Sequence, residues 1–369
     1  MKICFYSASR SPLDILQGAT TDRGGAEKQI AHLAKALAER GHEVYLLYSD
    51  EANNKHEPPD KISGVYCIKT NLETWKHPGE IFTFWRQLKQ IDPEIIYARL
   101  PDDFLWLLSL FARLHKRAKF VYALANDAHC NPWHTYRYNA WFHNPLYALG
   151  LYTAHVVLTQ HEGQQPLVRP YTFGKIRCLP NLMHSSVKQR REYKITDFDA
   201  IWIAQIRPQK QIVVFLDLVE RLPHLHFALV GGFNHTLDEP TQAALKARIR
   251  ELPNLEYLGL QKPNEAMRLL ARSKVLVNTS SEEGFPNTML EAWSVGVPVV
   301  SLTVDPGRVI VDNGLGLVSG NTARLCQDVE RLARVAALNH QLGDNGMVYV
   351  QKNHGRAVVL AAFEQVMSE

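Results

Sequence analysis

The sequence predicts an α/β protein built from two doubly wound domains that follow one another along the chain. Short apolar, strand-like segments alternate with amphipathic helical patterns over nearly all of its length, which is typical of parallel sheets covered by helices. The 369 residues exceed the size of about 250–300 residues at which a single core stops growing. Prolines and a charged run interrupt the alternation between residues 166 and 196. We therefore expect the first domain to span residues 1–182 and the second to span residues 183–350.

The composition is that of a globular chain with a mild positive charge. Hydrophobic residues make up 46% of the sequence and charged residues 21%, which excludes a disordered or fibrous protein. The net charge is +4, and residues 1–182 carry the whole excess, with 21 basic and 17 acidic side chains. This excess fits an anionic ligand or a lipid surface, whereas binding of nucleic acid would need a dense basic stripe. Ordinary solvated charge is the alternative interpretation.

The cysteines and the N-terminus indicate a cytoplasmic protein. The five cysteines form no C-x-x-C pair and are odd in number, so we expect no disulfide framework and a reducing compartment. The N-terminal segment lacks the apolar core of a signal peptide. The longest apolar stretch, residues 104–111, is shorter than the about 20 residues that span a bilayer. We expect a soluble protein, or one that binds the inner face of the cytoplasmic membrane peripherally.

The first domain opens with a strand–helix–strand unit. Residues 3–6 form a short apolar run, a polar loop follows to Gly25, and apolar residues then recur at helical spacing. Gly41 ends this helix, and residues 44–48 again have the pattern of a strand. Such a unit implies parallel strands joined by a right-handed crossover. Further strands of the same sheet are expected at residues 94–98, 120–125 and 155–159.

The second domain repeats this alternation more regularly, which predicts a second doubly wound sheet. Its expected strands are residues 200–206, 227–230, 255–258, 275–279 and 297–302. Its expected helices are residues 212–222, 241–250, 264–270 and 288–294, and a last helix follows at residues 358–367.

Residues 280–293, SSEEGFPNTMLEAW, have the pattern of a ligand site. They start where a strand ends at Thr279, contain a glycine loop and continue as a helix from Pro286. Backbone N–H groups of such a loop and helix N-terminus favour a phosphate, and ligands of open α/β sheets bind beyond the carboxyl ends of the strands. Glu283 and Glu291 can each accept several hydrogen bonds from sugar hydroxyls. Two solvated acids beside a helix are the alternative.

Glu283 and Glu291, separated by seven residues, resemble the E-x7-E signature of retaining GT-B glycosyltransferases, the glycogen-synthase-like family four. The resemblance implies the GT-B fold, in which two Rossmann-like domains face a central cleft. It also implies that Glu283 contacts the transferred sugar and Glu291 the ribose of the donor nucleotide. The segment between them would then contact the diphosphate through Gly284, Phe285, Asn287 and Thr288.

Two further segments are similar to that family. The loop with Gly24 and Gly25 resembles its N-terminal glycine loop, which faces the donor phosphate and the acceptor. Lys210 matches the family's lysine and suits a diphosphate as a compact cation. The family's usual arginine is replaced by Gln205, and Arg207, two residues further on the same face of the strand, is the expected substitute. Surface charges on a loop are the alternative for both cations.

The end of the strand at residues 120–125 carries a further candidate contact. The family has a histidine there, and this chain has Asn126 and Asp127, which makes Asp127 a candidate contact of the sugar or the acceptor. A metal site that combines Asp127 with Cys130 and the neighbouring histidines is rejected, because the spacing matches no zinc pattern. The resemblance also implies transfer without a metal, so we expect no metal and no cofactor.

Aromatic and basic residues gather in the first domain and bear on the acceptor. A helix after Asp102 has an apolar face that includes Trp106, and basic residues follow it. A second cluster lies just beyond and comprises Trp133, Tyr136, Arg137, Tyr138, Trp141, Phe142 and Tyr147. Aromatic and basic residues together suit the interface of an anionic membrane and a lipid-linked acceptor. For the first segment, a core helix buried between the sheet and a neighbouring element is the interpretation that we favour.

The sequence therefore predicts a retaining glycosyltransferase that moves a sugar from a nucleotide-diphosphate sugar to a saccharide or lipid-linked saccharide, in surface or exopolysaccharide biosynthesis. Residues 351–369 resemble the family's terminal helix, which crosses back to the first domain. This acceptor domain thus comprises residues 1–182 and 351–369, and residues 183–350 bind the nucleotide sugar. Catalysis is expected to rest on Glu283, Asp127, Lys210 and Arg207. A hydrolysing sugar-nucleotide epimerase of the same fold and an inactive nucleotide-binding protein are the alternatives.

Overall fold

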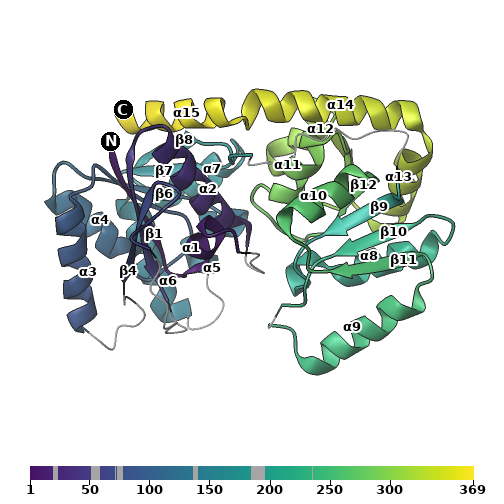
Figure 1. Ribbon diagram of the computed structural model, residues 1–369, viewed down its shortest axis with the longest axis horizontal. Helices are drawn as coiled ribbons and strands as arrows, with labels where there is room; N and C mark the ends of the chain where they lie inside the picture. Colours follow the sequence, from purple (N-terminus) through teal and green to yellow (C-terminus); the bar gives the residue numbers. More distant parts are fainter. Residues whose placement is uncertain are drawn as a thin grey trace. The chain divides into compact units, whose positions relative to one another are not determined.

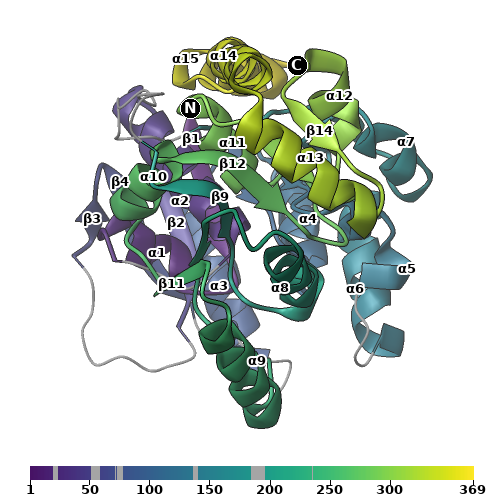
Figure 2. The same ribbon diagram turned by 90° about the vertical axis from the view of Figure 1, so that its right-hand side faces the viewer.

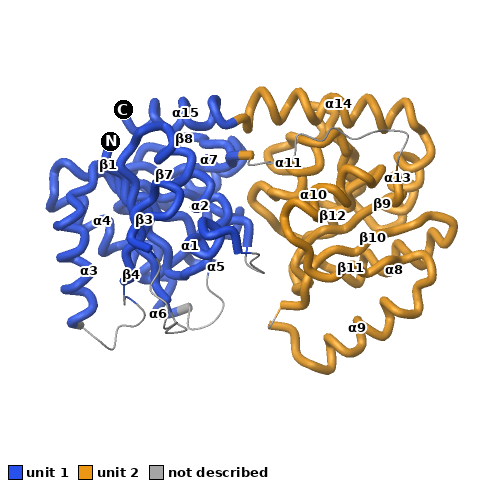
Figure 3. The backbone as a smooth tube through the Cα atoms, viewed as in Figure 1, with its two compact units in different colours: residues 1–182, 356–369 blue, residues 183–355 orange. Residues whose placement is uncertain are grey.

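The computed structural model describes residues 1–19, 24–50, 59–70, 72, 78–135, 140–183, 196–234 and 236–369. They form two compact units (Figure 3). Unit 1 comprises Met1–Leu182 together with Arg356–Glu369, and unit 2 comprises Met183–Gly355. The expectation that residues 351–355 belong to the first domain is wrong, because helix α14 (Ala336–Asn353) of unit 2 extends into them. A separate helix, α15 (Arg356–Ser368), then begins and belongs to unit 1.

Unit 1 contains a sheet whose strands run in the order β3-β4-β2-β1-β5-β6-β7-β8. Its described pairs are parallel apart from the short antiparallel pair of β3 and β4. The strands are β1 (Lys2–Ser7), β2 (Glu43–Ser49), β3 (Lys61–Ile62), β4 (Val65–Thr70), β5 (Ile95–Ala98), β6 (Lys119–Ala123), β7 (Val156–Thr159) and β8 (Lys175–Cys178). Because β1 lies between β2 and β5, the chain winds outward from β1 in both directions, as predicted for a doubly wound sheet.

Helices cover both faces of this sheet (Figure 1). They are α1 (Ser11–Leu16), α2 (Gly25–Glu39), α3 (Pro78–Ile91), α4 (Leu105–Leu114), α5 (Pro132–Thr135), α6 (Ala140–Thr153), α7 (Gln164–Val168) and α15. The sequence suggested only a polar loop between the first strand and Gly25, and the structure differs in this segment. It contains α1, because Pro12 fits the first turn of a helix and Leu13 is buried in the core.

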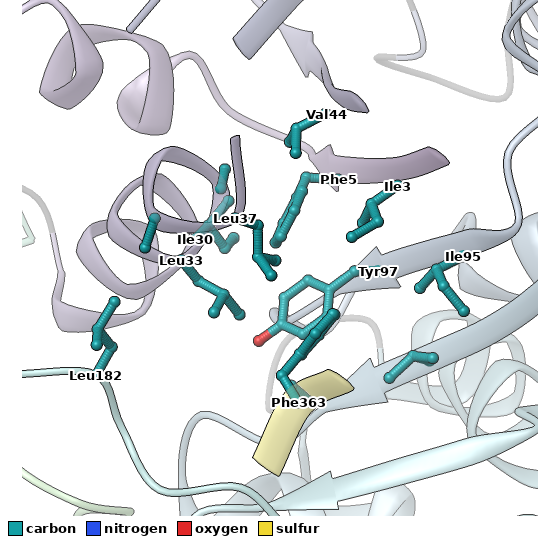
Figure 4. Packing of buried hydrophobic residues seen from close by; sticks show 14 of the residues in the cluster. Ile3, Phe5, Ile30, Leu33, Leu37, Val44, Ile95, Tyr97, Leu182 and Phe363 are labelled. Atoms are coloured by element: carbon teal, nitrogen blue, oxygen red, sulfur yellow. The ribbon is translucent and has the colours of Figure 1, made fainter. Parts of the chain in front are cut away.

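One face of the sheet packs on α2 and α15, and aromatic rings of β1 and β5 fill the space between them (Figure 4). The ring centres of Phe5 and Tyr97 lie 4.8 Å apart, and Phe363 of α15 lies 6.4 Å from Tyr97. Removal of these rings from water is favourable. The C-terminal helix therefore belongs to unit 1 through its buried apolar face.

Unit 2 contains a sheet of parallel strands in the order β11-β10-β9-β12-β13-β14. They are β9 (Phe198–Ile203), β10 (Phe227–Val230), β11 (Leu255–Gly259), β12 (Ser273–Asn278), β13 (Val299–Ser301) and β14 (Gly316–Val318). One face packs on α8 (Ile212–Arg221), α9 (Glu239–Glu251) and α13 (Thr322–Arg334), as Figure 2 shows. The other face packs on α10 (Pro263–Ala271), α11 (Asn287–Ser294), α12 (Val309–Asn313) and part of α14.

The strand order of unit 2 changes direction between β9 and β12. From β9 the chain continues to β10 and β11 on one side, and from β12 it continues to β13 and β14 on the other. In open α/β sheets, ligands bind beyond the carboxyl ends of the strands at such a switch point. The loops that follow β9 and β12 carry Lys210 and Glu283.

Candidate active site

Hydrogen bonds join the loop after β9 to the end of β12. The backbone N–H of Ser281 donates to the carbonyl of Gln209 at 2.9 Å, and the hydroxyl of Thr279 donates to the carbonyl of Lys210 at 2.7 Å. Buried Trp202 of β9 donates its Nε1–H to the Thr279 hydroxyl at 3.0 Å. The two loops therefore form one connected structure at the switch point of the sheet.

This connection brings Lys210 and Glu283 together. Lys210 ends the 3-10 helix η3 (Pro208–Lys210), and Gln211, with a left-handed φ of 49°, turns the chain into α8. The Lys210 ammonium donates to Oε1 of Glu283 in an ion pair. The two side chains are only 15% and 12% exposed, so solvent screens this pair less than a pair on the surface.

Helix α11, which follows Glu283, has one buried face and one polar face. Its buried residues are Met289, Leu290, Ala292 and Trp293. Asn287, Thr288 and Glu291 are partly exposed, and their spacing places them on one side of the helix. The helix begins at Asn287, after Pro286 as the N-cap. The proline side chain makes no cap hydrogen bond to the helix, and the N–H groups of a helix N-terminus favour a phosphate.

Gly284 and Phe285 lie in the interior of unit 2. Both residues are buried, and Phe285 packs edge-to-face on Trp293 with ring centres 6.2 Å apart. The ring of Phe285 also lies 5.0 Å from the ring of His354. The expected contact of Phe285 with a diphosphate can therefore be made only by its backbone.

Arg207 does not lie on a strand. β9 ends at Ile203, and Ile206 pairs again only in an isolated bridge. The expectation that Arg207 shares a strand face with Gln205 is therefore wrong. Arg207 instead precedes η3 with an extended backbone, and its Nε is buried without a hydrogen-bond partner among the described residues. This unused donor, three residues before Lys210, keeps Arg207 as a candidate ligand of the diphosphate.

In unit 1, Gly24 and Gly25 form the N-terminus of α2. Gly24 is the N-cap and Gly25 is the first helical residue, while Arg23 of the same motif lies outside the described residues. A Cβ atom on Gly24 would lie 3.1 Å from Oε2 of Glu27. The carboxylate of Glu27 thus already lies beside the first turn of α2, where helix N–H groups favour an anion.

Asp127 lies after the carboxyl end of β6 and is held by two side chains. Asn126 caps the 3-10 helix η1 by accepting the N–H of Ala128 at 2.9 Å. Oδ1 of Asp127 accepts from Nε2 of Gln164 at 2.8 Å and lies 3.2 Å from Nε2 of His161. The Asp127 side chain is 43% exposed, so it can contact a ligand while these partners hold it.

His129 and Cys130, the residues of the rejected metal pattern, are shielded from solvent. Burial lowers the pKa of His129 to about 4, and the charge of Arg99 acts in the same direction. Burial also raises the pKa of Cys130 to about 12. Within the part of the chain that the structure describes, no group of three or more His, Cys, Asp or Glu side chains is placed to hold a metal ion.

Two family models match the chain, one in each unit. Residues 23–184 match the model described as Glycosyltransferase Family 4, and residues 197–335 match the one described as Glycosyl transferases group 1. Sucrose-phosphate synthase from Thermosynechococcus elongatus superposes on 99% of this chain and 97% of its own, with a TM-score of 0.77 and 15% identity. Anabaena HepE in complex with UDP and glucose superposes on 100% of both chains, with a TM-score of 0.73 and 16% identity. The chain has the GT-B fold.

A curated relative of this GT-B protein is similar over part of the chain. Alpha-galactosylglucosyldiacylglycerol synthase of Streptococcus pneumoniae is 26% identical over 159 residues, which are 40% of this chain and 42% of the relative. The match thus spans less than half of the relative's length. Together with the family models, it supports a glycosyltransferase of the group 1 type.

The candidate residues lie in two different units. The ion pair of Lys210 and Glu283, together with α11, lies within the residues that match the group 1 model, and Gly24, Gly25 and Asp127 lie within those that match the family 4 model. His161 and Gln164 were not identified from the sequence. The polar run QHEGQQ directly after β7 is the signal that could have pointed to them.

The apolar helix after Asp102 is a core helix of this GT-B protein. α4 buries most of its apolar residues, and Trp106 packs against the same core, which decides between the two interpretations of this segment. At the far end of α4, Leu110 and Leu114 are exposed, and further exposed apolar side chains lie along α6 and after it, at Trp141, Phe142, Leu149 and Phe173. Tyr136, Arg137 and Tyr138 of the expected cluster lie outside the described residues. None of the helices in the described ranges has the length and apolar character needed to cross a membrane.

Proposed function

We propose that this protein is a retaining glycosyltransferase that moves a sugar from a nucleotide-diphosphate sugar to a saccharide or lipid-linked saccharide. The observation that carries the proposal is the ion pair of Lys210 and Glu283 at the switch point of unit 2, followed directly by the N-terminus of α11. A cation and helix N–H groups suit the diphosphate, and a carboxylate suits the sugar hydroxyls. The similarity to HepE, which was solved with UDP and glucose, supports the same class of ligand.

Each part of this loop system has a proposed role toward the donor. Lys210 and Arg207 bind the diphosphate together with backbone N–H groups of Gly284 and of the first turn of α11. Glu283 binds hydroxyls of the transferred sugar. Glu291 lies further along the polar face of α11 and binds the ribose, so the nucleotide would extend along this face from the sugar toward the base.

The proposed reaction is a front-face displacement with retention. The bond between the anomeric carbon and the diphosphate oxygen breaks, and a bond from the acceptor oxygen forms on the same face of the sugar. The departing diphosphate takes the proton of the attacking hydroxyl. Lys210 and the backbone N–H groups stabilise the negative charge that develops on the diphosphate, and we propose that these groups act without a metal or another cofactor.

We propose a lipid-linked acceptor and a peripheral contact with an anionic membrane. The contact surface, named here the α6 face, consists of Trp141, Phe142, Leu149 and Phe173. Trp141 and Phe173 are 81% and 87% exposed, and α6 contains no Asp, Glu, Lys or Arg. Exposed Arg169 precedes Phe173 in the chain, and aromatic and cationic side chains together suit a membrane interface. The similar protein of Streptococcus pneumoniae is by its name a synthase of a glycolipid, which supports a role in glycolipid or surface-polysaccharide synthesis.

A thermal-shift screen of UDP-, GDP- and ADP-sugars, followed by a transfer assay, tests the proposed function. We expect one nucleotide class to raise Tm and the product to keep the anomeric configuration of the donor. A hydrolysing epimerase would release nucleoside diphosphate and an epimerised free sugar without any acceptor. An inactive binding protein would be stabilised by the nucleotide and would release no product.

A further inference from the structure

Arg99 is a buried guanidinium that follows β5 directly. It is only 5% exposed. Its NH1 donates to the hydroxyl of Tyr97 at 3.3 Å, and its NH2 donates to Oδ1 of Asn181 at 2.6 Å. Its Nε is buried without a hydrogen-bond partner, and Arg99 makes no ion pair within the described ranges of the chain.

This environment leaves the charge of Arg99 without compensation. A buried cation is unfavourable unless an anion or a full set of hydrogen bonds replaces water. Arg99 has five N–H donors, and its partners are a phenol oxygen and an amide oxygen, both neutral. The planar fork of a guanidinium binds the two oxygens of a carboxylate or phosphate in parallel. Arg99 therefore has the donors for an oxyanion that the described part of the chain does not supply.

A chain of amide side chains, rather than carboxylates, leads away from Arg99 at the carboxyl ends of β7 and β8. Oδ1 of Asn181 also accepts from Nε2 of Gln160 at 3.2 Å. Gln164 donates to Gln160 at 3.4 Å and to Asp127 at 2.8 Å. The nearest carboxylate of this network is thus separated from Arg99 by three amides, and it lies where the network reaches the surface.

Two imidazole nitrogens of the same region are also buried without a partner in the described residues. They are Nδ1 of His161 and Nδ1 of His129. His161 is in contact with Asp127, and His129 is close enough to Arg99 for the guanidinium charge to lower its pKa. Buried polar groups in folded proteins are almost always paired. Several unpaired groups at one edge of the sheet therefore indicate a polar ligand.

We propose that Arg99 forms an oxyanion subsite in unit 1, which binds a phosphate or carboxylate carried by the acceptor. The assignment to the acceptor rests on the proposed function, since the donor is assigned to unit 2. Phosphate on a sugar or lipid and carboxylate on a uronic acid share the chemistry that the guanidinium recognises. An acceptor with such a group would bind with its charge at Arg99 and its hydroxyls near Asp127.

Calorimetric titration of the full chain tests this subsite with three probes that share a glucose ring and differ in the group at carbon 6. Glucose 6-phosphate, glucuronate and glucose are titrated in the presence of saturating nucleoside diphosphate, so that the donor site is filled. We expect at least one of the two anionic sugars to bind at least tenfold more tightly than glucose, and the stronger one identifies the group. Arg99→Met should lose this preference, Arg99→Lys should keep part of it, and exposed Arg117→Met should keep all of it.

Asn181→Asp gives a second test that does not depend on the stability of Arg99→Met. This nearly isosteric change places a carboxylate on Arg99 and supplies the missing counter-ion from within the chain. We expect it to raise Tm by about 2–4 °C and to abolish the preference for anionic sugars, while nucleotide affinity stays unchanged. In an Arg99→Met background the same change should lower Tm, because the new carboxylate is then buried alone.

Different results would overturn the subsite and the proposed function. If the protein binds nucleotide but prefers neither anionic sugar, or if Arg99→Met keeps the preference, the subsite is refuted and the glycosyltransferase proposal stands. A loss of nucleotide affinity in Arg99→Met would assign Arg99 to the donor and also refute the subsite. If no nucleotide binds while anionic sugars still bind through Arg99, the proposed function fails and the oxyanion site stands.

Discussion

Lys210 and Glu283 lie 73 positions apart in the chain and form an ion pair where β9 and β12 end side by side. Each charge offsets the other in surroundings that are largely shielded from solvent. The roles proposed for the two residues separate this pair, since the diphosphate accepts from the ammonium and sugar hydroxyls donate to the carboxylate. Donor binding would thus replace the ion pair by two charge-assisted interactions, one of the diphosphate with Lys210 and one of the sugar hydroxyls with Glu283. This exchange favours a ligand that carries both a diphosphate and a sugar.

Lys210→Met should weaken binding of a nucleoside diphosphate by about 10- to 150-fold, since a hydrogen bond to a charged group contributes about 1.5–3 kcal/mol. It should also lower Tm, because Glu283 is left shielded without its partner. The double variant Lys210→Met/Glu283→Gln should recover Tm and not nucleotide affinity, as measured by calorimetry. Exposed Lys352→Met is the control. Wild-type affinity in Lys210→Met would remove Lys210 from the donor site.

Glu291→Ala and Glu283→Ala should have different effects on the donor. Loss of the ribose contact in Glu291→Ala should weaken nucleotide binding by at least tenfold, because charge-assisted hydrogen bonds are lost. Glu283→Ala should mainly lower kcat, since its contact is with the sugar that is transferred. Titration with nucleoside diphosphate measures the effect on nucleotide binding, and steady-state kinetics measure the effect on kcat. Exposed Glu265→Ala is the control. Equal affinity and turnover in all three variants would show that the two acids only flank a helix.

The strand–helix alternation and the division after residue 182 could be predicted from the sequence, because the periodicity of side chains follows from backbone geometry. Several elements were missed, among them the long helices α3, α13 and α14. α1 and β14 contain too few residues to show a period. The end of β9 at Ile203 was also missed, since the apolar pattern continues to Ile206 while the pairing of the backbone stops.

The donor loop could be predicted as a local motif, whereas the network around Asp127 could not. Glu283 and Glu291 lie within one short segment, so their spacing carries information. His161 and Asp127 are 34 positions apart, and Arg99 and Asn181 are 82 positions apart. Only the parallel order of β5, β6, β7 and β8 brings these side chains to one edge of the sheet, and their spacing along the chain has no pattern.

Transfer should continue in the presence of EDTA. Lys210 and helix N–H groups are proposed to stabilise the departing diphosphate. The described residues hold no group of three or more His, Cys, Asp or Glu side chains placed to bind a metal ion. Initial rates measured after treatment with EDTA, and again after addition of Mg²⁺ or Mn²⁺, check this. A rate that disappears with EDTA and returns with either ion would contradict a metal-independent reaction.

Asp102→Asn should reduce the pH dependence of stability. Burial raises the pKa of Asp102 to about 6 from an ordinary value of 3.8, so the folded state binds its proton more tightly. This contribution to stability is complete below about pH 4 and is lost as the pH rises through 6.

Asparagine keeps the acceptor for the N–H of Phe104 and the hydroxyl of Tyr6. Melting curves from pH 4 to 8 should show the variant more stable than the parent above pH 6, by up to about 3 kcal/mol. A profile equally steep in Asp102→Asn would assign the pH dependence to another group.

Trp141→Ser and Phe173→Ser should weaken binding to anionic vesicles and leave nucleotide affinity unchanged. Both rings are almost fully exposed in unit 1. Insertion of a large apolar side chain into a membrane contributes about 1.5–3 kcal/mol to the free energy of binding. Each change should therefore lower the partition coefficient at least tenfold. Co-sedimentation with vesicles of phosphatidylglycerol and phosphatidylcholine measures this, and vesicles of phosphatidylcholine alone show how much of the binding depends on anionic lipid.

Val348→Ser is the matched control, because Val348 is an exposed apolar residue of unit 2. If the parent binds neither kind of vesicle, the α6 face does not contact lipid. If all three variants lose binding equally, the loss is not specific to that face.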